Sequence, residues 1–275
     1  MEIIDNSQNL IDKLNYHRKR GTEISLIPTM GNLHKGHLEL FCKAPKDTFK
    51  VVSIFVNPLQ FNDNNDYIHY PRSLNHDLDK CKECGVDLVY APLENITEEI
   101  NPERNIDLPK FTKYLCGASR ENHFRGVYKI VKHLFSQIKP VYACFGKKDY
   151  QQLLLIKYIA KTYFPNMTII EVDTIRENNI ALSSRLSRLD DRLLDNASII
   201  YTVLMKIKKS LINGNDFLKI RDEFIKKIED SDISVEYLEH RKNDTLELAD
   251  GTLDNSSLFI AYAIGSIRLI DNIQI

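Results

Sequence analysis

The segment Pro28–His37, which reads PTMGNLHKGH, carries the residue types best suited to binding a phosphate. Gly31 and Gly36 allow the backbone to turn tightly and to approach a ligand closely. An apolar run precedes the segment and a helical pattern follows it, so the unpaired N–H groups of a helix start would face a bound anion. His34 and His37 are three residues apart and would project toward the same place, where imidazoles donate to phosphate oxygens. The spacing predicts a phosphate-binding turn between a strand and a helix.

Other interpretations of the histidine and cysteine pairs stay open at this stage. An HxxH pair is also found in zinc sites, but zinc needs a third ligand and none stands out; the two histidines could also lie on the surface. Cys81 and Cys84 form a CxxC, for which a zinc site would require a second pair. The remaining alternatives for the cysteines are a redox pair, or two small residues on a helix that ends at Gly85.

Amide side chains follow the next apolar run, in the segment FVNPLQF. Asn57 and Gln60 offer donors and acceptors that suit hydroxyl and carboxylate groups of a ligand. The carboxyl ends of strands in an open parallel sheet are where ligands bind. The alternative is that these residues only form a turn.

Three further segments carry charges or hydroxyls at predicted element boundaries. Gly146–Gln152 reads GKKDYQQ, and two lysines with an aspartate at a helix start suit a triphosphate and its Mg²⁺; a solvated charge run is the alternative. Asp77 could hold Mg²⁺ or stabilise a helix start. Leu182–Arg185 reads LSSR, whose hydroxyls and guanidinium could close over phosphates.

Alternating strands and helices must position these segments. Short apolar runs predict strands at 23–28, 51–56, 87–90, 142–145 and 168–172, and helical patterns at 38–42, 74–84, 127–138 and 151–163 fall between them. Near the N-terminus Leu10, Ile11 and Leu14 form one apolar stripe of a helix. Nearly continuous apolar strands are typical of a sheet buried on both faces. The pattern predicts an α/β fold with a Rossmann-like, doubly wound parallel sheet.

After a boundary near 173–184 the pattern changes. Helices are predicted at 190–212 and 216–228, and strands at 234–239, 245–248 and 258–264. This order indicates a smaller α+β unit. We therefore expect a nucleotide- and substrate-binding domain over residues 1–175 and a smaller C-terminal lid domain over residues 176–275.

Composition excludes several classes of protein. Of 275 residues, 43% are hydrophobic and 27% charged, which excludes disordered and fibrous chains. A net charge of −1 gives no general attraction for nucleic acid or an anionic membrane. No apolar stretch is long enough to span a bilayer, and the N-terminus lacks a secretory pattern. Five scattered cysteines, an odd number, indicate a reducing cytoplasm.

Taken together, the segments resemble the pantothenate synthetase family of pantoate–β-alanine ligases, in the HIGH-motif nucleotidyltransferase superfamily. The resemblance rests on PTMGNLHKGH, VVSIFVNPLQF, YPRSLNHDL, HFRGV, YACFGKKDYQQ and ALSSR, with weaker matches at VEYLEHR and RLIDNI, in family order over residues 28 to 273. It implies that pantoate attacks the α-phosphate of ATP to give pantoyl adenylate and pyrophosphate. The amine of β-alanine then displaces AMP. It also implies Mg²⁺ as cofactor and a homodimer formed through the N-terminal domain.

The resemblance also implies roles for individual residues. His37 matches a proton donor, His34 a second phosphate contact, and Lys148 and Arg185 the residues that stabilise charge. Gln60 and Gln152 match pantoate-binding glutamines, Gln60 also lies beside the β-alanine position, and Asn57 lines the same pocket. Asp77 matches a possible Mg²⁺ ligand. The implied ATP contacts are Met30, Gly31, Asn32, Leu33, His34, Lys35, Gly36, His37, Gly146, Lys147, Lys148, Asp149, Ile175, Leu182, Ser183, Ser184 and Arg185.

Three positions depart from the family pattern. Lys147 replaces a usual glutamate, Asn178-Asn179-Ile180 replaces an aspartate–glycine turn, and Leu186 replaces an asparagine. None of the three changes removes a residue assigned to chemistry, so we expect an active enzyme; the changes bear on the mobility of loop 176–186. Adjacent residues at a helix start point about 100° apart, so Lys147 should face solvent or an acidic partner while Lys148 faces the phosphates. The alternative functions are another HIGH-motif nucleotidyltransferase and a non-catalytic nucleotide-binding protein.

Overall fold

The computed structural model describes residues 1–93, 96–100, 106–229 and 231–275, which fold into two compact units. Unit 1 comprises Met1–Pro109, Arg120–Lys147 and Gln152–Asp173, and unit 2 comprises Lys110–Ser119, Lys148–Gln151 and Thr174–Ile275. The units therefore interleave along the chain. A division into independent domains of residues 1–175 and 176–275 stays a prediction.

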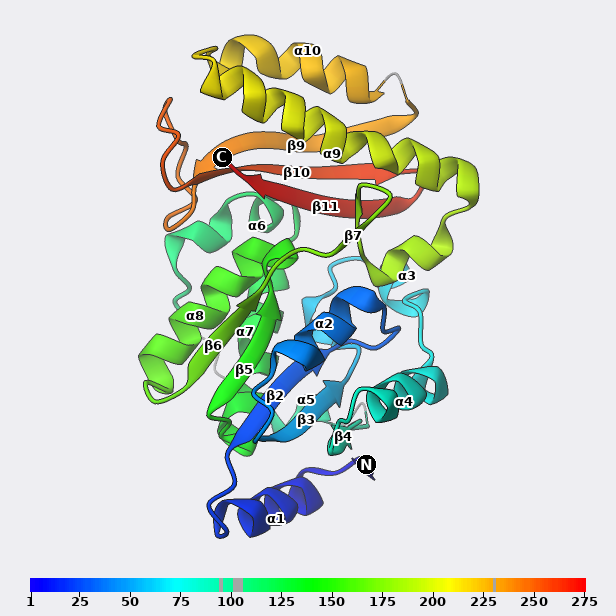
Figure 1. The fold of residues 1–275 in the computed structure, drawn as a ribbon, viewed down its shortest axis with the longest axis vertical. Coiled ribbons are helices and arrows are strands. Elements are labelled where there is room, and N and C mark those ends of the chain that lie inside the picture. The colour runs from blue at the N-terminus through cyan, green and yellow to red at the C-terminus, as the bar shows by residue number, and fades with distance from the viewer. Residues whose placement is uncertain (94–95, 101–105, 230) are drawn as a thin grey trace. The chain divides into compact units, whose positions relative to one another are not determined.

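Within the described residues of unit 1, six parallel strands form one sheet in the order β1-β4-β3-β2-β5-β6. The strands are β1 (Glu2–Ile4), β2 (Ile24–Thr29), β3 (Phe49–Ile54), β4 (Leu88–Tyr90), β5 (Tyr142–Gly146) and β6 (Thr168–Val172). Their apolar residues are buried, as the nearly continuous apolar runs predict. The predicted fold class is confirmed (Figure 1).

The order of the strands locates the ligand-binding edge of this sheet. From β2 the chain adds β3 and β4 on one side, and it later returns to place β5 and β6 on the other side of β2. In open parallel sheets, ligands bind at the carboxyl ends of the strands where the direction of winding reverses. Thr29 ends β2 and Gly146 ends the adjacent β5, so two predicted phosphate-binding segments begin at that point.

Helices connect and cover the strands of unit 1. They are α1 (Ser7–Arg18), α2 (Lys35–Lys43), α3 (Asn64–Ile68), α4 (Leu74–Glu83), α5 (Ile96–Glu99), α7 (His123–Ile138) and α8 (Tyr150–Tyr163), whose first residues belong to unit 2. Leu10 and Leu14 of α1 are fully buried, as their stripe predicts. Phe41 of α2 packs with Ile27 and Val52 of the sheet in one apolar core. This packing fixes the start of α2 against the end of β2.

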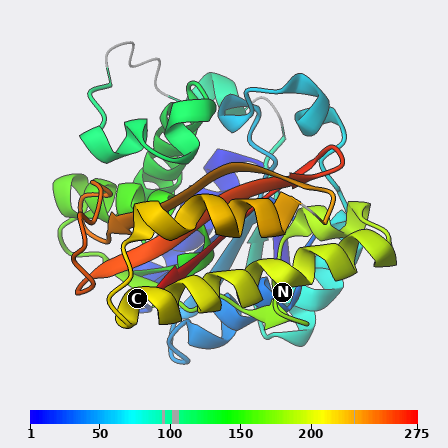
Figure 2. The same cartoon turned by 90° about the horizontal axis from the view of Figure 1, so that it is seen from above.

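Unit 2 is built around an antiparallel sheet of β9 (Ile233–Lys242), β10 (Ser256–Ile264) and β11 (Ile267–Gln274), with β10 in the centre. Helices α9 (Asp191–Ile212) and α10 (Phe217–Glu229) lie side by side on one face of this sheet (Figure 2). Their apolar residues share a core with β10 and β11. A short hairpin of β7 (Arg176–Glu177) and β8 (Ile180–Ala181) and the short helix α6 (Cys116–Ser119) complete the unit.

One strand predicted from the sequence does not form, and four of the described strands were not predicted. Residues 245–248 lie in a loop, with Leu246 at a φ of 53° and only an isolated bridge between Leu248 and Arg241. Strands β1, β7, β8 and β11 were not predicted. Among the described residues, no helix is both long enough and apolar enough to cross a membrane.

Candidate active site

Two histidines cap the start of α2 and hold each other in place. The Nδ1 atom of His34 accepts the N–H of Gly36 at 3.2 Å, and Nδ1 of His37 accepts the N–H of His34 at 3.2 Å. The two ring centroids lie 4.1 Å apart. Because each Nδ1 is an acceptor, the proton of each neutral ring is on Nε2. Both rings therefore present an Nε2–H donor at a helix start, where an anion is stabilised.

A buried carboxylate holds the turn that leads to these histidines. Gly31 and Asn32 adopt positive φ values of 78° and 48°. The carboxylate of Asp77, on α4, accepts the N–H of Asn32 at 2.8 Å and that of Leu33 at 2.7 Å. Ser73 Oγ adds a third hydrogen bond at 3.2 Å. Asp77 thus fixes a strained turn from 45 residues away in the chain.

These contacts leave Asp77 poorly suited to bind Mg²⁺. Its side chain is only 1% exposed, and both of its oxygens already accept hydrogen bonds. Among the described residues, no group of three His, Cys, Asp or Glu side chains is placed to hold a metal ion. The residues around Asp77 fit the capture of backbone N–H groups better than a metal site.

Asn57 and Gln60 lie together at the end of β3, on a short 3₁₀ helix, Pro58–Gln60. Asn57 Nδ2 donates to Gln60 Oε1 at 3.1 Å and to the carbonyl of Gly126 at 3.2 Å. Gln60 Nε2 contacts Sδ of Met30 at 3.0 Å, at the end of β2. The structure therefore brings Met30, Asn57 and Gln60, which were predicted from separate segments, into one cluster.

Gly126 of α7 packs directly on that 3₁₀ helix. A Cβ at position 126 would lie far inside contact distance of the carbonyl group of Leu59. Only glycine permits this approach, although glycine inside a helix costs about 1 kcal/mol relative to alanine. The glycine in the HFRGV segment was a signal of close packing that the sequence analysis did not use.

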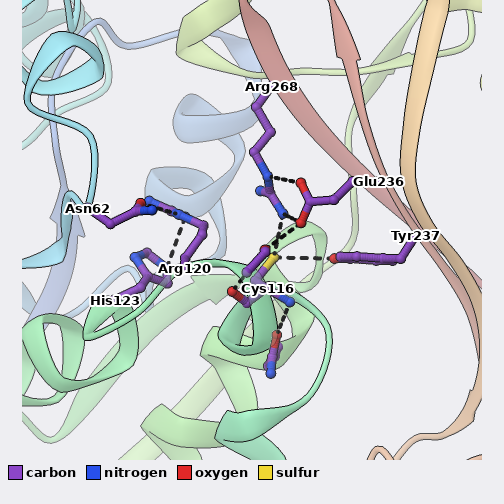
Figure 3. Close-up of polar contacts among 9 residues, drawn as sticks. Asn62, Cys116, Arg120, His123, Glu236, Tyr237 and Arg268 are labelled. Carbon is purple, nitrogen blue, oxygen red and sulfur yellow. Dashed lines mark hydrogen bonds and ion pairs between the residues drawn. The ribbon is translucent and has the colours of Figure 1, made fainter.

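His123, the first residue of α7, and Arg120, just before the helix, hold the same segment; Figure 3 shows the contact between these two side chains. The carbonyl of Gln60 accepts from His123 Nδ1 at 2.8 Å and from Arg120 Nη2 at 3.3 Å. Since Nδ1 of His123 must carry a proton to donate, its Nε2 accepts from Arg120 Nη1 at 3.2 Å. Neither residue was assigned a role from the sequence, and both position Gln60.

The two adjacent lysines of the GKKD segment have different partners. Lys147 Nζ lies 2.7 Å from Oδ1 of Asp173, the acidic partner that its direction predicted. This hydrogen bond and the lysine charge lower the pKa of Asp173. The Lys148 side chain is 19% exposed, with Nζ 3.8 Å from Asp149. Lys147 belongs to unit 1, and Lys148 and Asp149 belong to unit 2.

The altered loop of unit 2 is a well-formed hairpin. Asn178 and Asn179 have φ values of 47° and 65°, which fit a two-residue type I′ turn, and asparagine tolerates this conformation. Leu182 N donates to the carbonyl of Ile175 at 3.0 Å. The replacement of aspartate–glycine by two asparagines therefore keeps a tight turn, and Leu186 packs on the apolar core of unit 2.

The serines of this loop begin a 3₁₀ helix, Ser184–Arg188. Ser183 Oγ accepts the N–H of Arg185 at 3.3 Å. The serines and Arg185 thus start one short helical turn directly after β8.

The two adjacent glutamines of α8 differ in their surroundings. Gln151 is buried: its Oε1 accepts the N–H of Cys116 at 3.1 Å, and its Nε2 donates to the carbonyls of Phe111 and Tyr114 at 2.8 and 2.7 Å. Gln152 is half-buried and belongs to unit 1. Gln151 is therefore a structural residue, which the repeated letters of the sequence did not reveal.

The predicted site residues fall in both units. Unit 1 contains Met30–His37, Asn57, Gln60, Asp77, Gly146, Lys147 and Gln152, and unit 2 contains Lys148, Asp149, Ile175 and Leu182–Arg185.

The CxxC pair fits the packing interpretation. Cys81 is fully buried on α4, where burial and then the charge of Asp77 raise the pKa of its thiol to about 12. A thiol with that pKa is almost entirely protonated at neutral pH, and the thiolate is the reactive form. All five cysteines, each within the described residues, carry free thiols.

Comparisons with known proteins cover almost the whole chain. A family model described as pantoate-beta-alanine ligase matches residues 2–274. The chain is 39% identical to a pantothenate synthetase of Neisseria meningitidis serogroup B, with 100% of this chain and 99% of that protein covered. It is 38% identical to a pantoate–beta-alanine ligase of Schizosaccharomyces pombe, with the same coverage.

Solved structures give the same picture. A pantothenate synthetase from Thermus thermophilus superposes with a TM-score of 0.86 at 32% identity, covering 100% of this chain and 99% of that one. A pantoate-beta-alanine ligase from Francisella tularensis, complexed with beta-gamma ATP and beta-alanine, gives a TM-score of 0.85 at 34% identity, covering 100% and 97%.

Proposed function

The chain belongs to the pantoate–β-alanine ligase family, and from this premise we propose how its own residues carry out the reaction. The enzyme condenses pantoate with β-alanine to form pantothenate through a pantoyl adenylate, and it converts ATP to AMP and pyrophosphate. Family membership favours this reaction over the two alternatives, which are the reaction of another HIGH-motif nucleotidyltransferase and nucleotide binding without catalysis. The observation that carries the residue roles is the pair of Nε2–H donors that His34 and His37 present at the start of α2.

In the first step, a carboxylate oxygen of pantoate attacks the α-phosphorus of ATP and pyrophosphate leaves. Negative charge develops on the phosphate oxygens, so positioned donors and cations stabilise the transition state. We assign this role to His34 and His37, to the N–H groups at the start of α2, and to Lys148 and Arg185. The other predicted ATP contacts, from Met30 to Gly36, Gly146 to Asp149, Ile175 and Leu182 to Ser184, would surround the nucleotide.

Gln60, Asn57 and Gln152 would bind pantoate. The Asn57–Gln60 hydrogen bond fixes the direction of the Gln60 amide, and His123 and Arg120 fix its backbone. In the second step, the amine of β-alanine attacks the carbonyl carbon of the mixed anhydride, and AMP leaves with the electron pair of the broken C–O bond. Holding the amine and the anhydride in contact removes much of the entropic barrier.

Mg²⁺ would enter with ATP and neutralise its phosphates. The environment of Asp77 favours a structural role for that carboxylate over a metal-ligand role. We also propose a homodimer that assembles through residues of the N-terminal domain, and a cytoplasmic location; both follow from the family resemblance and the free cysteines.

Detection of AMP with each substrate omitted in turn tests the reaction. AMP should form only when ATP, pantoate and β-alanine are all present, and pyrophosphate should form with ATP and pantoate. His37→Ala should lower the rate of pyrophosphate release by about 10²–10³, the usual cost of losing one such donor. His69→Ala, at an exposed position of unit 1, is the matched control. Near wild-type adenylate formation by His37→Ala would refute the assigned role.

A further inference from the structure

The RLIDNI segment of β11 places a carboxylate, Asp271, in the interior of unit 2 and a half-buried amide, Asn272, on the other face of the strand. Asp271 is only 3% exposed, and its neighbour Asn272 lies beside it in a strand that otherwise alternates apolar residues. A buried carboxylate is costly unless a cation and hydrogen bonds satisfy it. Neither residue has a role in the reaction described above.

Asn272 holds the segment that carries Lys148. Its Nδ2 donates to the backbone carbonyl of Lys148 at 2.9 Å. Since Lys148–Gln151 belongs to unit 2, this bond joins the segment to the sheet of its own unit. The position of the Lys148 backbone therefore depends on β11.

A second attachment secures the other end of that segment. The side chain of Gln151 binds the backbone of the segment Lys110–Ser119. That segment is held in turn by the sheet: Cys116 Sγ lies 3.2 Å from the hydroxyl of Tyr237, and Ser119 donates to Glu236, which pairs with Arg268 (Figure 3). Gln151, three residues after Lys148, is thus held by contacts that do not involve Asn272.

Asp271 holds the hairpin that leads to the serine–serine–arginine loop. Arg176, the first residue of β7, makes a bidentate ion pair with Asp271, with Nη2 2.7 Å from Oδ1. The same Nη2 donates to the carbonyl of Asn272 at 3.1 Å. The guanidinium lies over the ring of Tyr201, 4.3 Å from its centroid. The entry to the loop is therefore fixed at β11 as well.

We propose that Asp271 and Asn272 are positioning residues for catalysis, Asn272 for Lys148 and Asp271, through Arg176, for Ser183–Arg185. One strand then sets both groups of phosphate-binding residues that unit 2 supplies. This proposal rests on the proposed roles of Lys148 and Arg185. It gives the RLIDNI segment a role in catalysis that does not depend on contact with a substrate.

A double-mutant cycle between Asn272 and Lys148 tests the first half. Asn272→Ala should lower kcat for pantoate-dependent pyrophosphate release by about tenfold or more, because small misplacements are costly to the rate, and leave KM for pantoate unchanged. In a Lys148→Ala background, Asn272→Ala should have almost no further effect, since coupled residues are not additive. Ser257→Ala, which removes a buried hydrogen bond to Asn243 in the same sheet, is the control and should keep wild-type kcat.

The outcomes separate the proposal from its premise. Additive effects of Asn272→Ala and Lys148→Ala, or a kcat for Asn272→Ala equal to that of Ser257→Ala, would overturn the positioning role. Wild-type rates for Lys148→Ala would instead refute the role of Lys148 and with it this inference.

Arg176→Lys tests the second half, since Asp271→Asn leaves a buried unpaired guanidinium that can prevent folding. The lysine keeps the charge and loses the bidentate geometry. KM for ATP should rise about tenfold in Arg176→Lys, and adding Arg176→Lys to Arg185→Ala should cause almost no further rise. Unchanged KM for ATP in soluble, folded Arg176→Lys would overturn this half.

Discussion

Asp77→Asn distinguishes a carboxylate that holds the phosphate-binding turn from one that binds Mg²⁺. Asparagine keeps the shape of the side chain, but its NH₂ group must face either the N–H of Asn32 or that of Leu33, since Asp77 accepts from both. One buried N–H is then left without an acceptor, at a cost of about 1–3 kcal/mol, and the other loses a charged partner. We expect the free energy of unfolding to fall by roughly 2–4 kcal/mol, a large part of the usual 5–15 kcal/mol.

Urea unfolding without ATP or Mg²⁺ measures this loss directly. Because the turn carries His34 and His37, the folded variant should also release pyrophosphate at least about tenfold more slowly at saturating Mg²⁺. Asp79→Asn, an exposed residue two positions along α4, is the control and should match the wild type in both assays.

A metal-ligand role would give the opposite pattern. In that case Asp77→Asn would unfold like the wild type when Mg²⁺ is absent, and a large excess of Mg²⁺ would restore its rate. Either result would refute the assignment of Asp77 to the turn.

Three further predictions concern a surface lysine, the pantoate pocket and pH. Lys147→Glu should change kcat/KM by less than about tenfold, because Lys147 pairs with exposed Asp173. Lys148→Ala should lower kcat/KM at least about a hundredfold. Steady-state kinetics with varied ATP measure both effects, and a larger loss in Lys147→Glu than in Lys148→Ala would contradict this prediction. Gln60→Ala should raise KM for pantoate far more than KM for ATP, by about 1–3 kcal/mol in binding, and equal rises would refute the assignment. Burial lowers the pKa of His240, so as the pH falls below about 6.5 the unfolded chain binds a proton at His240 before the folded protein does. The free energy of unfolding should therefore fall between pH 7 and pH 5, and it should fall less in His240→Gln. Identical pH profiles of the free energy of unfolding in the two proteins would exclude this contribution.

The parallel sheet could be predicted from the sequence because its strands are buried on both faces. Val51 and Val52 of β3, like Leu26 and Ile27 of β2, are fully buried, and such runs leave little ambiguity. Strand β11 escaped prediction because Asp271 interrupts its apolar pattern, and only the pairing with Arg176, 95 residues away, makes that position tolerable. The error at 245–248 has a local cause. The segment reads TLEL, so Leu246 and Leu248 alternate with polar residues as in a strand, although both leucines lie in a loop.

The candidate site was predicted as residue types at strand ends, and its supports were not. The turn at Gly31 and the amides at Asn57 and Gln60 follow strands, which a sequence displays directly. The contacts of Asp77 with Asn32, and of His123 with Gln60, join segments 45 and 63 residues apart. No local pattern encodes such distances, so the groups that orient the site emerge only from the fold.

The interleaving of the two units has a consequence for how the chain is made. The backbone passes from one unit to the other after Pro109, Ser119, Lys147, Gln151 and Asp173. Cys116 emerges from the ribosome 121 residues before Tyr237 and 152 before Arg268, so its segment waits for most of synthesis before it is covered.

Long-range contacts of this kind slow folding and leave apolar surface open to association in the meantime. The parallel sheet of unit 1 does not depend on the C-terminal residues, because β6 is the last of its strands along the chain. A fragment that stops near residue 175 should therefore form the parallel sheet and yet aggregate through the uncovered segments Lys110–Ser119 and Lys148–Gln151. Supplying the missing C-terminal residues as a second fragment should restore a soluble complex.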